Sequence, residues 1–246
     1  MALKEEMERQ GNWLFRYRSI LAIGILLFAL VIFIEMKLNH SPLSVCDYIF
    51  EYFCLLISLT GLGIRMYTVG YSPKNTSGSN TIQGQLADTL NTTGIYSLVR
   101  NPLYLGNFFM WLGLAMLTEN AWFVVCFILL YWMYYERIIF AEEQFLERKF
   151  GEEYTEWAAR VPVFIPNFNK FSKPELKFNI NKVLFKEKNG FFALFLLFSF
   201  FNIIEENIRK HTHYNMVFIT GCLVATVGYL IMKWLKTNPR FFNENL

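Results

Sequence analysis

The chain has 246 residues, of which 54% are hydrophobic, 18% aromatic and only 17% charged, and its net charge is +3. A soluble protein of this length could not hide so much apolar surface, so the composition excludes an ordinary soluble domain. The apolar residues are also gathered into runs, which is the pattern of membrane-spanning segments.

Six apolar segments are predicted to be transmembrane helices, since a hydrocarbon layer of about 30 Å needs roughly 20 residues at 1.5 Å per residue. The first begins too far into the chain for a signal peptide and lacks a small-residue cleavage pattern, so we expect it to be retained. The third is short for a full crossing and lies so close to the fourth that the two are expected to form a tight hairpin. The six segments are residues 19–36, 43–66, 102–117, 121–140, 190–204 and 216–235.

Basic residues orient these segments, because Lys and Arg accumulate on the cytoplasmic side of a membrane. With the N-terminus inside, all of the 23 basic residues except Lys37, Arg209 and Lys210 fall on the cytoplasmic side. The sequence therefore predicts an all-α, multi-pass integral membrane protein with about six transmembrane helices and both termini in the cytoplasm. If the source is bacterial, the membrane is the inner one.

The chain divides into three predicted regions. The first holds two spans, the second holds a polar loop, the hairpin and a further helix, and the third holds a basic linker and the last two spans. Their bounds are residues 1–71, 72–168 and 169–246.

Three connecting segments have a distinct composition. Residues 72–91 are rich in Ser, Thr, Asn and Gly and are expected to form a flexible loop. Residues 136–157 have apolar residues at helical spacing and are expected to form one helix that leaves the membrane. Residues 167–188 are basic and are expected to be irregular, either in contact with anionic lipid headgroups or as a solvated linker.

The segment TGIYSLVRNPLYLG, residues 93–106, marks the start of the hairpin. Proline favours the first turn of a helix, and the side chain of Asn101 can accept a hydrogen bond from the free amides of that turn. Helix starts bind anions, although many membrane helices begin in this way without a function. Polar neighbours at the same interface make a binding pocket the stronger interpretation: Asp88, Thr89, Asn91, Tyr96, Arg100 and Tyr104.

A pair of carboxylates, Glu142 and Glu143, follows where the fourth span should emerge from the membrane. A solvated helix face accounts for Glu143. If the helix folds back toward the hairpin, Glu142 can accept hydrogen bonds from the ribose hydroxyls or the amino group of a bound nucleoside. Arg137 lies five residues earlier, about 140° around the helix, so it is expected on an adjoining wall.

The segment GIYSLVRNPLYLG, the Glu pair and FGEEYTEWAARVPVFIP together resemble the isoprenylcysteine carboxyl methyltransferase family and its bacterial relatives. The resemblance covers about residues 81–166 and implies a pocket on the cytoplasmic side for S-adenosyl-L-methionine. It implies substrate contacts at Arg137 and Arg160. The implied methyl-donor contacts are Asp88, Thr89, Leu90, Asn91, Tyr96, Asn101, Pro102, Leu103, Tyr104 and Glu142.

Two features depart from the family pattern. The family's usual histidine is Asn101 in this chain, which excludes any mechanism that needs an imidazole at that position. The chain also continues for about eighty residues and two apparent spans beyond the RVP motif, residues 160–162. Its substrate can therefore differ from that of typical members of the family.

Methyl transfer to a carboxylate or phosphate oxygen needs no general base, because the nucleophile is already ionised. We therefore expect O-methylation of an anionic group on a lipid, with Arg137 and Arg160 holding that group. The resemblance implies a prenylcysteine carboxylate, and a lipid phosphate such as that of lipid A is the acceptor we favour. The alternatives are N-methylation of a phospholipid amine, a sterol-type reductase that uses NADPH, and a membrane scaffold without activity.

Other signals are weak. His211 and His213 form a pair on the predicted outer side, so no metal site is expected. The four cysteines lie in or beside apolar segments without a CxxC pair and are expected to be unpaired packing residues. The expected partners are a lipid or lipidated substrate and the membrane itself, with no nucleic acid and no obligate protein partner.

Overall fold

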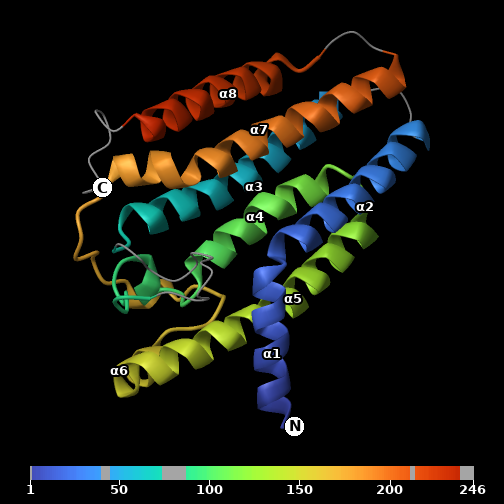
Figure 1. The fold of residues 1–246 in the computed structure, drawn as a ribbon. Helices are drawn as coiled ribbons and strands as arrows, with labels where there is room; N and C mark the ends of the chain where they lie inside the picture. The colour runs from blue at the N-terminus through green and yellow to red at the C-terminus, as the bar shows by residue number, and fades with distance from the viewer. Residues whose placement is uncertain (1, 40–44, 74–86, 211–213, 239–246) are drawn as a thin grey trace.

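The computed structural model describes residues 2–39, 45–73, 87–210 and 214–238. These residues form eight α-helices and two short 3-10 helices, and their only extended pairing is an isolated antiparallel bridge between Gly94 and Ser172 (Figure 1). The elements are α1 (Leu3–Arg16), α2 (Arg18–Asn39), α3 (Val45–Gly70), η1 (Ile95–Ser97), α4 (Pro102–Met116), α5 (Ala121–Phe150), α6 (Glu152–Arg160), η2 (Phe168–Lys170), α7 (Ile180–Arg209) and α8 (Met216–Thr237).

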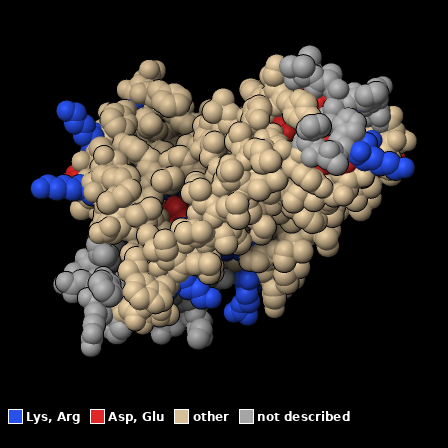
Figure 2. All heavy atoms as spheres, turned by 90° about the horizontal axis from the view of Figure 1, so that it is seen from above, with Lys and Arg blue, Asp and Glu red and all other residues tan. Residues whose placement is uncertain are grey.

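The structure confirms an all-α polytopic membrane protein. Five of the described helices, α2, α3, α5, α7 and α8, are long and apolar enough to cross a membrane, and α4 is a shorter apolar helix. Large apolar side chains cover much of the outside, as at Trp122 and Val224, which are 81% and 66% exposed. The face that carries α7 and α8 shows a broad uncharged area with Lys and Arg side chains toward its edges (Figure 2).

The helices pack around α3, α4 and α7. The longest contact joins α3 to α4, α7 lies beside α3, and α8 lies on α7, while α1 packs along α5 (Figure 1). The α3–α4 contact is close because both helices carry glycine there. A Cβ atom on Gly61 would lie 2.4 Å from the carbonyl oxygen of Gly106. Small residues that let helix backbones approach in this way are typical of membrane helix pairs.

A buried charged network joins three connections at one end of the bundle. Lys37, near the end of α2, contacts Glu119 in the α4–α5 turn at 2.6 Å and Glu205 near the end of α7 at 2.8 Å. Arg209 contacts the same Glu205 at 3.0 Å. The connections that the topology assigned to one side therefore lie together, and the side that faces the cytoplasm stays a prediction.

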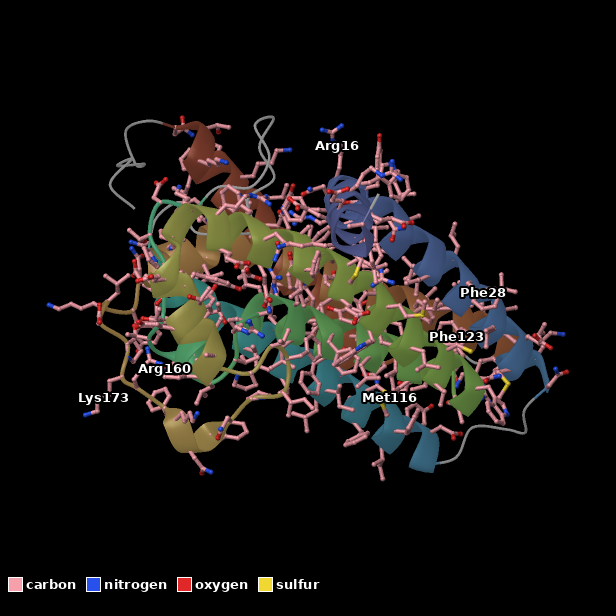
Figure 3. The ribbon with its side chains drawn as sticks, turned by 90° about the horizontal axis from the view of Figure 1, so that it is seen from below. Arg16, Phe28, Met116, Phe123, Arg160 and Lys173 are labelled. Atoms are coloured by element: carbon pink, nitrogen blue, oxygen red, sulfur yellow. The ribbon has the colours of Figure 1, made fainter. Side chains whose placement is uncertain are left out.

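The opposite end carries the candidate site. Figure 3 shows Arg160 and Lys173 at the end of the bundle away from Phe28 and Phe123, whose rings pack 5.8 Å apart. The described parts of the predicted flexible loop, residues 72–73 and 87–91, also lie at this end, and its residues 74–86 lie outside the described residues. The division into three regions stays a prediction.

Two predicted elements are wrong in their extent. The helix predicted over residues 136–157 is broken at Gly151, whose φ of +55° favours glycine, so α5 ends there and α6 begins. The irregular segment predicted over residues 167–188 becomes helical at Ile180. The Asn179 side chain caps this start by accepting a hydrogen bond from the Lys182 amide at 3.0 Å.

Candidate active site

The structure brings residues 160–166, which we call the RVP segment, against the start of α4. The Arg100 amide donates to the Pro162 carbonyl at 2.9 Å, and the Asn101 side chain donates to the Val163 carbonyl at 3.2 Å. The Trp157 indole on α6 donates to the Tyr96 carbonyl at 3.3 Å. Segments that are some sixty residues apart in the sequence are therefore held together by hydrogen bonds to backbone carbonyls.

The start of α4 is partly as expected. Pro102 occupies the first turn and Asn101 is the N-cap residue. The predicted capping bond is wrong, because the Asn101 side chain accepts no hydrogen bond from the first turn. Its amide group is used instead to hold the RVP segment.

A polar cavity of about 280 Å³ lies beside this helix start, and a smaller one of about 40 Å³ adjoins it. The two share Tyr96, Arg100, Asn101 and Glu142, so they form one continuous lining, which we call the polar cavity. All but one of the predicted methyl-donor contacts line it: Thr89, Leu90, Asn91, Tyr96, Asn101, Pro102, Leu103, Tyr104 and Glu142. The exception is Asp88, which is exposed and outside the lining.

Two buried polar atoms in this cavity point to a ligand. Glu142 is 7% exposed and Tyr104 is 8% exposed. Neither the Tyr104 hydroxyl nor the Oε1 atom of Glu142 makes a hydrogen bond of good geometry within the described residues, although the two groups are close enough to interact. Buried polar atoms are nearly always paired, so a ligand with hydroxyl or amino groups fits here.

Tyr96 lies between the two parts of the polar cavity. Burial raises the pKa of its phenol to about 12. Its hydroxyl therefore stays protonated near neutral pH and can donate a hydrogen bond.

The arginines in the polar cavity are not the two that were predicted as substrate contacts. Arg18, Arg65 and Arg100 line it. Arg137 and Arg160 are absent from its lining, and their predicted role as substrate contacts stays a prediction.

Both predicted arginines are engaged elsewhere. Arg137 is half-buried, and its guanidinium lies 3.7 Å from Glu136. Arg160 is exposed, and its Nε donates to the Glu156 carbonyl at 3.1 Å. The 140° turn between Arg137 and Glu142 on α5 is enough to send their side chains to different surfaces.

Sequence reasoning missed Arg18 and Arg65, because each follows the positive-inside pattern at the predicted cytoplasmic end of a span. The positive-inside pattern explains an arginine at such a position even when it belongs to no binding site. Arg100 stood in the motif and was noted, and the structure pairs it with Glu143 at 3.1 Å.

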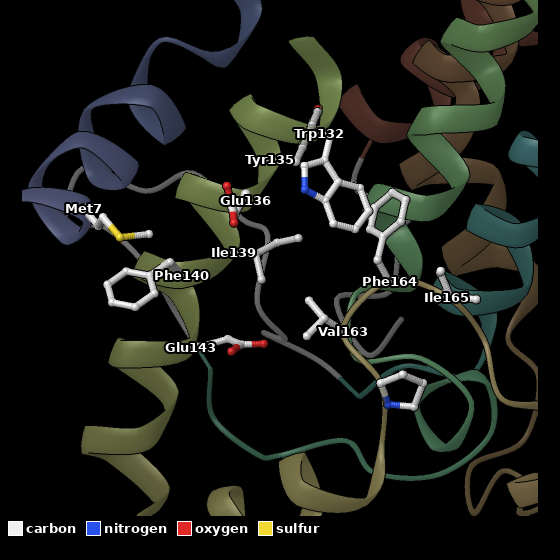
Figure 4. Close-up of a pocket in the computed structure, with 11 residues that line it drawn as sticks. Met7, Trp132, Tyr135, Glu136, Ile139, Phe140, Glu143, Val163, Phe164 and Ile165 are labelled. Carbon is white, nitrogen blue, oxygen red and sulfur yellow. The ribbon is translucent and has the colours of Figure 1, made fainter. Parts of the chain in front are cut away.

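An apolar cavity of about 440 Å³ opens next to the polar one. Figure 4 shows Met7 from α1 and Phe140 from α5 on one side, and Val163, Phe164 and Ile165 from the RVP segment on the other. Tyr135 lines both this cavity and the polar one. No feature of the sequence indicated this cavity, because its aromatic and aliphatic residues are of the kinds found in any transmembrane segment.

The absence of a metal site at His211 and His213 stays a prediction. His211 and His213 lie outside the described residues. Within the described ranges, no three His, Cys, Asp or Glu side chains are grouped as metal ligands.

Comparison with known proteins gives partial matches. Residues 49–153 match the phospholipid methyltransferase family. The cobalt-zinc-cadmium resistance protein CzcN of Cupriavidus metallidurans is 35% identical over 117 residues, which are 48% of this chain and 52% of that protein. No solved structure matches.

Two other relatives are enzymes by name. The protein-S-isoprenylcysteine O-methyltransferase of Schizosaccharomyces pombe is 41% identical over 78 residues, 31% of this chain and 33% of that protein. That of Mus musculus is 36% identical over 127 residues, 48% of this chain and 44% of that protein. The chain spans about half the length, or less, of the curated relatives it matches. From these matches and from the motifs that the fold brings together, the chain is similar to the phospholipid methyltransferase family, over residues 49–153, and to proteins named protein-S-isoprenylcysteine O-methyltransferase.

Proposed function

We propose that this chain is an S-adenosylmethionine-dependent membrane methyltransferase that O-methylates an anionic group on a lipid or lipidated substrate. The observation that carries the proposal is the pair of adjoining cavities at one end of the bundle. One is polar, with a buried carboxylate and three arginines, and the other is apolar. A soluble cosubstrate in the polar cavity and an apolar substrate in the other can meet at Tyr135, which lines both cavities.

The polar cavity suits the methyl donor. The buried Glu142 can accept hydrogen bonds from ribose hydroxyls or from an amino group, and the start of α4 at Pro102 offers free amides to an anionic group. Tyr96 and Tyr104 supply aromatic faces and hydroxyls. S-adenosylmethionine would bring a methyl group on a sulfonium, which is the electrophile of the reaction.

The apolar cavity suits a lipid chain. Its lining of Met7, Trp132, Phe140 and Phe164 contains little polar surface other than Glu136 and Glu143. A chain bound there would place its head near Tyr135, at the border of the polar cavity. The cavity volume of about 440 Å³ lies within the range of small-molecule sites.

The residues need only orient and desolvate the reacting groups. A carboxylate or phosphate oxygen is ionised near neutral pH, so no side chain has to remove a proton. Holding two reactants in line can lower a barrier by several kcal/mol. An arginine in the polar cavity can hold the acceptor's anionic group by charge-assisted hydrogen bonds.

The acceptor is either a carboxylate or a phosphate at the head of the lipid. The names of the Schizosaccharomyces pombe and Mus musculus relatives favour a prenylcysteine carboxylate over a lipid phosphate such as that of lipid A. Chemical stability separates them, because carboxyl methyl esters are hydrolysed by mild base while methyl phosphodiesters and methylamines persist.

A binding test comes first. Purified protein in detergent should bind S-adenosylhomocysteine in isothermal titration and should not bind NADPH. The opposite preference would replace the methyltransferase with a reductase. Membranes that contain the protein are then incubated with tritiated S-adenosylmethionine, and label is sought in lipid and in protein before and after mild base. Label in neither fraction would contradict the proposal.

A further inference from the structure

Arg65, in the lining of the polar cavity, is held by a carboxylate from another helix. Its Nε donates to Oε2 of Glu187 at 2.8 Å, and its Nη2 donates to Oε1 of the same carboxylate at 2.8 Å. Its Nη1 donates to the Asn107 side chain at 2.6 Å. A two-point pair of this kind fixes the plane of the guanidinium as well as its position.

The route of the Arg65 side chain is also fixed. It passes over Gly106 on α4, where an added Cβ atom would lie 2.6 Å from Cγ of Arg65. The glycine therefore leaves room for the side chain to lie between α3 and α4. From there the guanidinium reaches the polar cavity together with Asn107.

Glu187 belongs to α7, which follows the region matched to the family, residues 49–153. Its side chain is 5% exposed, and that of Arg65 is 22% exposed. A buried carboxylate of this kind is costly to desolvate unless it is paired. Arg65 provides that pairing, and in return its own guanidinium is held beside the cavity.

We propose that Glu187 is a positioning residue that orients Arg65 toward a carboxylate or phosphate group bound in the polar cavity. The inference rests on the proposed function, since it concerns a ligand of the same site. Three of the five N–H donors of the guanidinium are engaged by Glu187 and Asn107. The remaining two donors can bind an anion in the polar cavity. The α7 helix thereby completes the site.

The pairing also limits how tightly an anion is held. Glu187 neutralises much of the Arg65 charge, so Arg65 directs a ligand mainly by hydrogen-bond geometry. An acceptor oxygen held in this way keeps its electrons available for attack on the methyl group. Without Glu187 the guanidinium would regain charge but lose its fixed orientation, and we expect the loss of orientation to dominate, so that the anion binds more weakly.

The anionic group has two possible sources, the carboxylate of the methyl donor and the head of the acceptor. The first arm of the test measures binding of S-adenosylhomocysteine and of methylthioadenosine, which lacks the amino acid carboxylate. The second arm measures KM for the lipid fraction that the wild-type protein labels. Both arms use the full chain in detergent.

Four variants are compared: Glu187→Gln, Arg65→Lys, the double variant and Glu205→Gln. The last is the matched control, because Glu205 is also a buried, ion-paired carboxylate of α7 but lies at the other end of the helix. Glu187→Asp is added in case Glu187→Gln lowers the yield of folded protein. It keeps the charge but shortens the reach, so an intermediate effect is expected.

If Arg65 contacts the donor, Glu187→Gln should weaken S-adenosylhomocysteine about tenfold and spare methylthioadenosine, as expected for one lost charge-assisted hydrogen bond. If it contacts the acceptor, KM should rise about tenfold with donor binding unchanged. Either result supports the inference, provided that the double variant is no worse than Arg65→Lys and that Glu205→Gln changes neither constant.

Three results would overturn it: wild-type constants for Glu187→Gln, additive effects in the double variant, or the same losses in Glu205→Gln. A wild-type protein that binds no S-adenosylhomocysteine and labels nothing would instead contradict the proposed function.

Discussion

The side-chain amide of Asn101 donates a hydrogen bond to the main-chain carbonyl of Val163 at 3.2 Å. This bond joins the start of α4 to the RVP segment, so one side chain borders the polar cavity and also ties down a wall of the apolar one. Asn101 stands where the family usually has histidine. The structure shows a role for it that needs a donor and no charge.

Substitutions at Asn101 should follow the need for a donor. Asn101→Asp replaces the donating nitrogen by an oxygen that repels the Val163 carbonyl, while Asn101→His retains a ring N–H. We expect Asn101→Asp to lower the rate of methyl transfer about fivefold or more, since one hydrogen bond is worth about 1 kcal/mol. Asn101→His should stay within about twofold of wild type. Equal rates for the two variants would show that the hydrogen bond from Asn101 to the Val163 carbonyl does not affect methyl transfer.

Glu142 should be the main carboxylate for the methyl donor. Glu142→Gln replaces a buried carboxyl group by an amide that offers only one acceptor oxygen, and we expect S-adenosylhomocysteine to bind about tenfold more weakly, from about 1.5 kcal/mol for one hydrogen bond. Isothermal titration measures this directly. Glu147→Gln, on the exposed part of the same helix, is the control and should bind as wild type does. An unchanged affinity for Glu142→Gln would place the donor elsewhere.

The apolar cavity should select the lipid. Val163→Trp fills part of the cavity, and we expect KM for the lipid acceptor to rise about tenfold, the equivalent of burying roughly two fewer methylene groups. Binding of S-adenosylhomocysteine should not change. Val125→Trp, on the exposed surface of α5, is the control for adding the same side chain. A rise in KM with both variants would point to a general effect on the membrane surface.

The close α3–α4 contact should tolerate no larger residue at Gly61. Gly61→Ala puts a Cβ atom 2.4 Å from the Gly106 carbonyl oxygen and 2.6 Å from the Met110 amide, so the helices must separate. Overpacking of this kind costs about 1–3 kcal/mol. Thermal unfolding in detergent should show a lower Tm. Gly63→Ala, two residues along the same helix, meets no atom within 4 Å and should unfold like wild type or at a higher temperature.

Lys37 should be essential to the buried charged network. Lys37→Met leaves Glu119 and Glu205 without their shared cation, and we expect a loss of about 3–5 kcal/mol in the free energy of unfolding. Arg148→Met is the control, because its ion pair with Glu8 is largely exposed and should contribute less than about 1 kcal/mol. The ratio of folded to unfolded protein in a denaturant titration reports both. Equal losses would mean that burial does not strengthen the Lys37 pairs.

The sequence predicted the presence of the helices better than the residues at which they begin and end. Long apolar runs identify α2, α3, α5, α7 and α8 whatever lies beside them, since a membrane demands helices of that length. The break at Gly151 and the early start of α7 at Ile180 were missed. Both depend on local backbone geometry and a capping side chain that a periodic pattern does not carry.

The candidate site was predictable only where motifs marked it. The segment around Asn101 and the carboxylate of Glu142 stood out by residue type and spacing, and the structure places them in one cavity. Arg137 and Arg160 were chosen by resemblance, and neither lines that cavity. Arg18 and Arg65 do line it, although nothing in their neighbourhood in the sequence distinguishes them from the other basic residues predicted to be cytoplasmic.

The amino-acid sequence by itself determined that this protein is an all-α membrane protein and that its motifs resemble those of a methyltransferase family, because apolar length and short motifs are local properties of a chain. Only the tertiary structure decided which arginines face the polar cavity, that an apolar cavity adjoins it, and that Glu187 of α7 holds Arg65. These depend on helix rotation and on contacts between residues more than a hundred positions apart, and no local pattern records either.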